Sequence, residues 1–320
     1  MLRYNRDMKK DKEKYFFGVD VGGTTIKMGI FRMNGDLVDK WEIRTRTEND
    51  GTAILPDISE SICNKQREYG ITRGEVPAVG IGIPAAVYGD GIVENTSNLG
   101  WGYKEVKREL EELTNLPIYV ENDANLAALG EMWKGAGRGH RNLVMVTLGT
   151  GVGGGIIADG HIITGVKGGA GEIGEIRVAQ EADGDDVIWR NLEYYASATG
   201  IVRLAGRKLK ETTEKSSLHV KRLTAKDVFD AVKAKDRVAI DVAEAFGHYL
   251  GRVLSDLAVI LAPEVFVIGG GVSKAGDVLL EYIRRGCTTE NIRLVLAELG
   301  NDAGIYGAAR LALQETGIDY

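Results

Sequence analysis

Short hydrophobic runs, separated by polar and glycine-rich segments, recur along the chain and predict alternating strands and helices. Runs enriched in Val, Ile and Phe are typical of buried strands, whereas apolar residues at three- and four-residue spacing predict amphipathic helices. Strands are predicted at residues 16–20, 26–31, 37–43, 76–83, 117–120, 143–148, 156–158, 161–163, 264–268 and 292–296. Helices are predicted at residues 52–69, 103–114, 124–133, 191–209, 236–261, 278–284 and 301–315. Residues 180–190 are polar and acidic, and we expect them to be irregular. The pattern is that of an α/β protein.

A glycine- and threonine-rich turn joins two predicted strands in each half of the chain. The first turn lies at residues 22–25 and the second within residues 149–155. After the second strand of each unit comes a two-residue hairpin signal, Asn-Gly at 34–35 and Asp-Gly at 159–160. Each half therefore repeats the order strand, turn, strand, hairpin, strand.

Such turns suit the binding of an anion. Glycine adopts positive φ readily, so the turn can leave backbone N–H groups facing outward, and these groups with threonine hydroxyls form an anion cradle. Asp20 ends the strand before the first turn, where a carboxylate suits a Mg²⁺ ion bound to the same anion. The alternative is an ordinary glycine-rich hairpin, and one copy does not decide between them. Two copies indicate duplicated domains that each offer a phosphate-binding turn to one nucleotide.

The second turn also matches the dinucleotide-binding pattern G-x-G-x-x-G, at Gly149, Gly151 and Gly154. That motif requires a helix directly after the glycines. Here Ile156 and Ile157 follow and predict a strand, so we reject a dinucleotide site. The chain contains no G-x-x-x-x-G-K-[ST] pattern either, which excludes a P-loop.

Composition narrows the classes of function. The chain has 320 residues, enough for about two domains, and is 44% hydrophobic and 27% charged, as in globular proteins with a full core. A net charge of −6 argues against nucleic acid or an anionic membrane surface as a partner. No apolar run approaches the ~20 residues of a membrane span. Residues 1–14 are charged and have no apolar core, so we expect a solvated tail and a cytoplasmic location. Cys63 and Cys287 alone provide neither a disulfide framework nor a zinc quartet.

Candidate catalytic side chains follow the strand predicted at 117–120. Asn122 and Asp123 stand between this strand and the next helix, the place where open α/β sheets bind ligands. The alternative for Asp123 is a helix cap. Glu172 and Glu175 lie in a glycine-rich loop, and for Glu175 the alternative is a solvated surface acid.

Taken in order and spacing, a series of motifs resembles those of the ROK sugar kinases (repressor, open reading frame, kinase) of the actin-like ATPase superfamily, and most closely the bacterial glucokinases. The motifs are DVGGTTIK at 20–27, GIGIP at 80–84, ENDANLAALGE at 121–131, LGTGVGGGII at 148–157, GGAGEIGE at 168–175, LEYYASATG at 192–200, IGGGVS at 268–273 and NDAGIYGAA at 301–309. The resemblance implies two actin-like (ribonuclease H-like) ATPase domains around an interdomain cleft. The N-terminal domain would span 15–123 and the C-terminal domain 124–320, with a closing helix that can pack back on the N-terminal domain.

The resemblance also implies roles for individual residues. Asp123 would be the catalytic base on the acceptor hydroxyl, and Asp20 would hold Mg²⁺ through water. Asn122, Asp123, Glu172 and Glu193 would contact the sugar hydroxyls, with Asn98 and Glu175 as further candidates. ATP would be bound by Gly22, Gly23, Thr24, Thr25, Lys27, Thr150 and Gly151 at its phosphates and by Gly270 and Gly271 at its adenosine.

Two positions depart from the family pattern. Many members have His at the position of Glu175 and a cysteine-rich segment before the sugar-binding glutamate, and these residues bind a structural zinc. Residues 178–193 contain no cysteine, so we predict no zinc and expect packing of Ile188 and Trp189 to hold the loop instead. The second departure is Ala85, where the family usually has Gly beside the sugar.

The predicted function is therefore an ATP-dependent hexose kinase of glycolysis, with glucose as the acceptor and glucose 6-phosphate and ADP as products. The alternatives are a kinase for N-acetylmannosamine, N-acetylglucosamine, fructose or mannose, and a non-catalytic sugar-binding or regulatory protein. A repressor of the same family is disfavoured, because residues 1–14 are too few for a helix-turn-helix domain. The family suggests a homodimer or a larger homo-oligomer. The phosphate donor, including inorganic polyphosphate, stays open.

Overall fold

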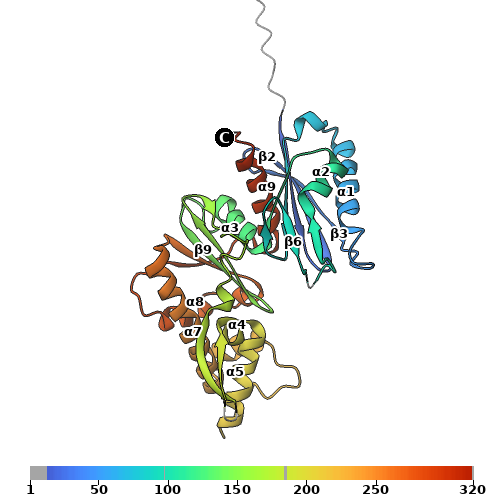
Figure 1. Ribbon diagram of the computed structural model, residues 1–320. Helices are drawn as coiled ribbons and strands as arrows, with labels where there is room; N and C mark the ends of the chain where they lie inside the picture. The colour runs from blue at the N-terminus through green and yellow to red at the C-terminus, as the bar shows by residue number, and fades with distance from the viewer. Residues whose placement is uncertain (1–12, 97, 184–185, 319–320) are drawn as a thin grey trace, which may run out of the picture.

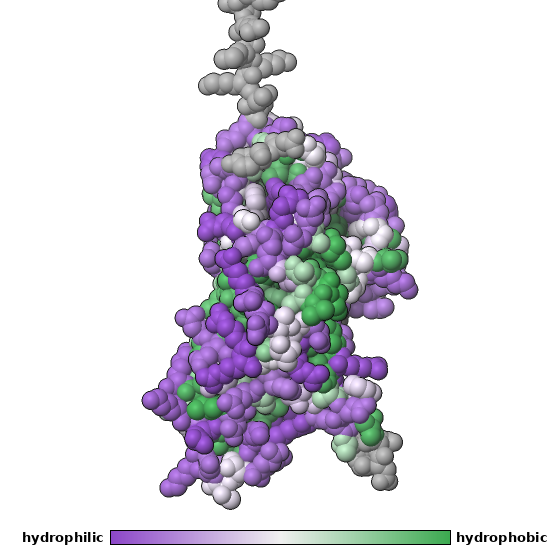
Figure 2. Space-filling model, turned by 90° about the vertical axis from the view of Figure 1, so that its left-hand side faces the viewer, coloured by the Kyte–Doolittle hydropathy of each residue, from purple (hydrophilic) through white to green (hydrophobic). Residues whose placement is uncertain are grey.

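Two mixed five-stranded sheets with helices packed against them dominate the computed structural model, which describes residues 13–96, 98–183 and 186–318. Figure 1 shows the two sheets in separate halves of the molecule, with α3 and α9 at their junction. None of the described helices is both long enough and apolar enough to cross a membrane. On the face shown in Figure 2 polar residues predominate, and hydrophobic residues gather in smaller patches.

The second sheet repeats the strand order of the first. The first sheet runs β3 (Leu37–Arg44), β2 (Thr25–Arg32), β1 (Tyr15–Val21), β4 (Val79–Ile83) and β8 (Ile118–Asn122). The second runs β11 (His161–Ile162), β10 (Val152–Ala158), β9 (Leu143–Leu148), β14 (Val265–Gly269) and β15 (Leu294–Leu296). In both sheets the first three strands pair antiparallel and the last three parallel. The predicted repeat of strand, turn, strand and hairpin is confirmed.

The remaining elements are helices and short strands between the sheets. The α-helices are α1 (Ile54–Tyr69), α2 (Val106–Thr114), α3 (Asp123–Lys134), α4 (Leu192–Ala196), α5 (Ala198–Glu211), α6 (Ala225–Lys233), α7 (Arg237–Leu261), α8 (Asp277–Gly286) and α9 (Ala303–Glu315). Short strands are β5 (Val87–Tyr88), β6 (Ile92–Glu94) and β7 (Tyr103–Glu105), and β12 (Arg177–Asp183) pairs with β13 (Asp186–Asn191). One-turn helices cover Arg73–Glu75, Ile173–Glu175, Gly271–Ala275 and Gly300–Asp302.

Alternation along the strands gives each sheet two different faces. In the first sheet, Phe17, Val19 and Ile81 belong to the core formed with α1 and α2. The opposite face carries Gly18 and Gly80 and receives α9. A Cβ atom on Gly80 would stand 1.8 Å from the carbonyl oxygen of Ala308, so only glycine allows the helix to lie this close. In the second sheet, residues of β9 pack alternately into the core shared with α5 and α7 and into the core shared with α3.

The closing helix α9 packs between the two halves. Ile305 and Ala309 belong to a core with the first sheet, whereas Ala308 belongs to the core of α3 and the second sheet. The two helices cross in backbone contact, because a Cβ atom on Gly307 would lie 1.7 Å from the carbonyl oxygen of Leu126. Because of this crossing, the first turn of α3 lies beside α9, and the first turn of α9 lies beside α3.

Three sequence predictions are wrong in detail, and one helix was missed. Residues 180–183 and 186–190, predicted within an irregular segment at 180–190, are paired strand residues of β12 and β13, and residues 184–185 lie outside the described residues. The helix predicted at 191–209 is broken into α4 and α5, because the Ser197 hydroxyl caps α5 by accepting from the N–H of Gly200. The helix predicted at 103–114 begins at Val106, since residues 103–105 pair as β7. Helix α6 was not predicted.

The hairpin is held in a different way from the predicted packing of Ile188 and Trp189. Trp189 is 51% exposed. Instead, the Glu181 carboxylate accepts from the guanidinium of Arg207, with Nη2–Oε2 2.9 Å, and from the Tyr195 hydroxyl. Tyr195 stacks in turn on Tyr249 of α7, with ring centroids 3.9 Å apart. An ion pair and aromatic stacking therefore tie the hairpin to α5 and α7.

Candidate active site

A cavity of about 650 Å³ opens between the two sheets. From the first half it is lined by Asp20, Lys27, Asn122 and Asp123, and from the second by Gly149, Gly151, Glu172, Glu193 and Gly270. The ends of parallel strands and the starts of α3 and α9 thus meet at one place, which is where open α/β sheets bind ligands.

Asp123 is presented at the first turn of α3. Asn122 is the N-cap, since its Oδ1 accepts from the N–H groups of Ala124 (2.9 Å) and Asn125 (3.2 Å). Its Nδ2 donates to the carbonyl oxygen of Ala85 at 3.2 Å. Asn122 therefore does the capping that was the alternative for Asp123, and the Asp123 carboxylate lines the cavity.

The environment of Asp123 favours its protonated form. Burial is the main reason why the pKa of Asp123 rises from its ordinary value of 3.8 to about 6, and the negative charges of Asp20 and Glu172 add to the rise. The N–H of Ala124, which donates to Oδ1 at 2.8 Å, opposes it. A carboxylate with a pKa near neutrality is suited to take up a proton during a reaction.

Asp20 lies opposite Lys27 across the β1–β2 pair, with Nζ–Oδ2 3.7 Å. Burial raises the pKa of Asp20, and the charge of Lys27 opposes that rise. Lys27 also donates to the carbonyl oxygen of Asn301 at 3.1 Å, ahead of α9. On α9 itself, a Cβ atom on Gly304 would stand 2.7 Å from the Asp20 Cγ. The first turn of α9 therefore packs directly against the Asp20 carboxylate.

Asp20 fits the chemistry of a Mg²⁺ ligand. It is a largely buried carboxylate at the edge of a phosphate-type turn, and its one ion pair in the described part of the chain is with Lys27. Mg²⁺ typically takes one or two carboxylates and fills its other positions with water and phosphate oxygens. Residues 13–96, 98–183 and 186–318 contain no group of three or more His, Cys, Asp or Glu side chains placed to hold a metal ion.

The first glycine turn closes without the left-handed glycines that we expected. Gly22 and Gly23 have no positive φ. A Cβ atom on Gly22 would clash with the carbonyl oxygen of Thr25 at 2.9 Å, and one on Gly23 would make a tight contact with the Cβ of Asn98 at 3.2 Å. The N–H of Gly22 donates to the carbonyl oxygen of Thr25 at 3.0 Å, and Thr24 is exposed. Asn98 therefore lies against this turn.

The second glycine turn holds Glu193. The N–H of Val152 donates to its Oε2 at 3.0 Å, and a Cβ atom on Gly151 would stand 2.4 Å from the same oxygen. Partial burial, followed by the charges of Glu175 and Glu193, raises the pKa of Glu172. Glu175 itself is exposed, and its Oε2 accepts from the Nδ2 of Asn191 at 3.2 Å.

A second cavity of about 470 Å³ adjoins the first and shares Gly149 with it. Its walls are largely apolar and include Phe229, Val272 and Ala275. Much of one side comes from α6, which the sequence reading missed. Its signal is the capping box at residues 224–227, where Thr224 and Asp227 cap each other. Such a pocket suits a flat, mainly apolar group.

The structure brings most of the predicted site residues together. Those that line the first cavity are Asp20, Lys27, Asn122, Asp123, Gly151, Glu172, Glu193 and Gly270. Those that line the second are Thr150 and Gly271. Those that line neither are Gly22, Gly23, Thr24, Thr25, Asn98 and Glu175.

Comparison with known proteins agrees with this geometry. The model of the ROK family matches residues 16–315. A curated glucokinase of Halalkalibacterium halodurans is 43% identical over 317 residues, which cover 95% of this chain and 96% of the relative. The crystal structure of a ROK family glucokinase from Streptomyces griseus, in complex with glucose and AMPPNP, matches with a TM-score of 0.72 and 33% identity over 94% of this chain and 99% of that one. A ROK hexokinase from Thermus thermophilus matches with a TM-score of 0.79 and 29% identity, over 95% and 99%. The predicted two-domain, actin-like fold class and the family resemblance are confirmed.

Proposed function

This chain belongs to the ROK family, and from that premise we propose that it is an ATP-dependent hexose kinase that converts glucose to glucose 6-phosphate. The curated relative at 43% identity is a glucokinase, and the match extends over nearly the full length of both chains. The observation that carries the proposal is the Asp123 carboxylate, which lines the cavity between two glycine turns with a pKa of about 6.

Asp123 acts as the catalytic base. It accepts a hydrogen bond from the acceptor hydroxyl and takes its proton as the hydroxyl oxygen forms a bond to the γ-phosphorus. The bond from that phosphorus to the bridging oxygen breaks, and ADP leaves. Phosphoryl transfer depends mainly on alignment and charge neutralisation, and a base with a pKa near the working pH is most effective.

The other polar side chains of the cavity select and orient the sugar. Glu172 and Glu193 accept hydrogen bonds from hydroxyl groups, and the Asn122 amide donates as well as accepts. Asn98 and Glu175 do not line the cavity and are candidates for contact once the two halves approach each other. Glu175 replaces the usual family His, and Ala85 lines the cavity.

The nucleotide occupies the two glycine turns and the apolar cavity. Gly22, Gly23, Thr24, Thr25, Thr150 and Gly151 supply N–H and hydroxyl donors to the phosphates, and Lys27 supplies a positive charge. Gly270 and Gly271 flank the adenosine. Mg²⁺, held by Asp20 through water, neutralises phosphate charge when it is bound.

Further parts of the proposal concern the whole chain. We propose domains at 15–123 and 124–320, with α9 packed on the first. A homodimer or larger homo-oligomer and a cytoplasmic location also belong to the proposal. No structural zinc is proposed, since thiolate ligands normally fix such a site and residues 178–193 lack cysteine.

The deciding experiment measures ADP release from Mg-ATP with a panel of hexoses and N-acetylated hexosamines, together with the total zinc of the same preparation. We expect fast turnover with glucose and no stoichiometric zinc. Turnover with a different sugar alone would keep the kinase and change its substrate. Sugar binding without turnover of any sugar would contradict the proposed activity.

A further inference from the structure

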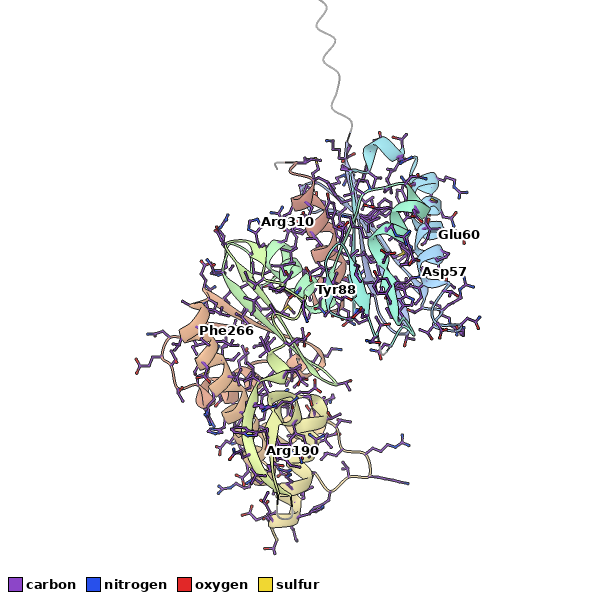
Figure 3. The ribbon with its side chains drawn as sticks, in the orientation of Figure 1. Asp57, Glu60, Tyr88, Arg190, Phe266 and Arg310 are labelled. Carbon is purple, nitrogen blue, oxygen red and sulfur yellow. The ribbon has the colours of Figure 1, made fainter. Side chains whose placement is uncertain are left out.

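A third cavity, of about 650 Å³, is separate from the catalytic cleft. Its walls are the ends of α3 and α9, with Trp133 and Lys134 on the first helix and Arg310 and Gln314 on the second. Two hairpin turns complete it, the β2–β3 turn at Asn34 and the β10–β11 turn that begins at Asp159. Figure 3 shows Arg310 on α9 at the junction of the two halves. No residue of this cavity lines the catalytic cleft.

The cavity is basic. Its lining includes Lys134, His140, Arg141, His161 and Arg310, and Asp159 is the one acid among the described residues that line it. The guanidinium of Arg141 binds that acid, with Nη2–Oδ1 2.8 Å and Nε–Oδ1 3.0 Å. Two positive charges, on Lys134 and Arg310, therefore remain. The carboxyl ends of two helices supply about one negative charge in total, which offsets only part of them.

Arg310 is the unusual member. Its Nε is buried and has no hydrogen-bond partner, and no ion pair to Arg310 exists within the described residues. Burial lowers the pKa of its guanidinium. Its nearest notable contact is the Trp133 ring, whose centroid lies 5.8 Å from Cζ. Arg310 is half-buried and has no ion pair within the described residues, so its charge is only partly compensated by the Trp133 ring and is available to an anion in the cavity.

The helices that carry this cavity also carry the catalytic cleft. Asp123 begins α3 and lines the cleft, and Gly304 near the start of α9 lies against Asp20. A bound molecule that contacts Arg310 and Lys134 would touch the far ends of both helices. The Gln314 Nε2 already donates across the junction to the carbonyl oxygen of Gly160 at 3.0 Å. A molecule bound in this cavity would therefore contact both halves, and its binding would depend on how the two halves are placed relative to each other.

We propose that this cavity is a regulatory site for the phosphate group of a small phosphorylated molecule, with Arg310 and Lys134 as its main ligands. A phosphate oxygen would accept from the guanidinium of Arg310, which lines the cavity, and a doubly charged oxyanion would neutralise the charges of both Arg310 and Lys134. The regulatory part of the proposal depends on the kinase activity proposed above, whereas the binding part does not.

The binding test uses thermal unfolding and tryptophan fluorescence of the full chain with inorganic phosphate, against chloride at matched ionic strength. Variants are Arg310→Met, Lys134→Met and, as a control, Arg138→Met, an exposed arginine outside the cavity. We expect saturable stabilisation of the wild type and of the control. Affinity should fall by about tenfold or more in each of the first two variants. Phosphate at the glycine turns is unaffected by these substitutions, so the difference between the proteins isolates the cavity.

Arg310→Met has a second expected effect. Without phosphate it should unfold at the same temperature as the wild type or higher, because it removes a half-buried charge that has no ion pair within the described residues. Equal phosphate affinity in the wild type, Arg310→Met and Lys134→Met would overturn the site. If Arg310→Met fails to fold, the phosphate affinity of Lys134→Met decides, since Lys134 has no ion pair within the described residues and methionine keeps the apolar part of its packing beside Trp133 and Gly35.

The regulatory test measures KM and kcat for the sugar with and without phosphate. We expect a change of about twofold or more in the wild type and none in Lys134→Met. Phosphate binding without any change in KM or kcat would contradict the regulatory role, but the cavity would still be a phosphate-binding site. Glucose 6-phosphate and AMP are then compared with inorganic phosphate, and tighter binding of one identifies the carrier of the phosphate group. If no sugar is phosphorylated, the proposed kinase function is contradicted. The phosphate-binding test does not depend on kinase activity and still decides whether the cavity binds phosphate.

Discussion

Replacing Asp123 with Asn should abolish turnover and stabilise the protein at the same time. The amide has nearly the shape of the carboxylate but cannot take a proton, so the acceptor hydroxyl loses its base. General-base catalysis contributes about 10²- to 10⁴-fold, and we expect a loss of kcat in that range while sugar binding survives. The stabilisation has a different origin, since the amide removes a carboxylate that the fold holds at an energetic cost.

The size of that cost follows from the pKa of Asp123. The value rises from 3.8 to about 6 on folding, and a difference of about two pH units corresponds to about 3 kcal/mol. The raised pKa means that the folded protein binds the proton more tightly than the unfolded chain. Above about pH 7 both states are ionised and the full cost is present. As the pH falls through about 6 the folded state takes up the proton, and below about pH 4 the cost has disappeared.

Urea unfolding of the wild type and Asp123→Asn across this pH range measures the effect. The variant should be more stable by about 2–3 kcal/mol near pH 7, and the two curves should meet near about pH 4. Asp277 is a matched control, because it is also the first residue of a helix but is exposed. Asp277→Asn should change stability by about 0.5 kcal/mol or less. Equal stability of wild type and Asp123→Asn at neutral pH would refute the buried-carboxylate argument, and near-normal turnover would refute the base.

Three further changes probe the surroundings of this carboxylate. Lys27→Met removes the cation beside Asp20, the proposed Mg²⁺ ligand, and we expect kcat to fall by about tenfold or more. Steady-state kinetics at saturating Mg-ATP is the assay, and an unchanged kcat would exclude Lys27 from the site. Gly304→Ala inserts a methyl group 2.7 Å from the Cγ of Asp20, so the free energy of unfolding should fall by about 1–3 kcal/mol. Gly206 on α5 has open space around it, so the control Gly206→Ala should raise the free energy of unfolding by about 0.5–1 kcal/mol. Glu175→Gln removes a charge that raises the pKa of Glu172, so the Glu172 carboxyl should titrate at a lower pH in the variant, as NMR of the labelled carboxyl carbon would measure; an unchanged titration of Glu172 would refute this coupling.

The parts of the fold that the sequence predicted well rest on local signals. Hydrophobic runs, glycine turns and Asn-Gly or Asp-Gly hairpins act over a few residues, so both β-units follow from them directly. Asp20 and Asp123 are predicted from similar local signals, because Asp20 ends an apolar run and Asp123 stands between such a run and the next helix. Their position at strand ends already predicts a crevice, and the cavity contains both.

The parts that were missed depend on contacts between distant segments. The β12–β13 hairpin pairs with no other strand and exposes both Val187 and Trp189, so its sequence lacks the one-sided alternation of a buried strand. The only sequence signal that we identify for helix α6 is the capping box formed by Thr224 and Asp227. The role of Gly304 is invisible in the sequence, where it is one glycine in a helix, because the reason for it is the Asp20 carboxylate far away along the chain.

The negative charges of Asp20 and Glu172 near Asp123 also oppose closure of the cleft. Asp123 lies at the start of α3, beside the first sheet, and Glu172 is in a loop of the second half, yet each of Asp20 and Glu172 raises the pKa of Asp123. Bringing the halves together without ligands would bring these carboxylates closer and increase the repulsion. A sugar between Asp123 and Glu172 would give both acids hydroxyl donors, and a cation at Asp20 would cancel part of its charge. We therefore expect closure to require both substrates, which would also keep water from accepting the phosphoryl group when the sugar is absent.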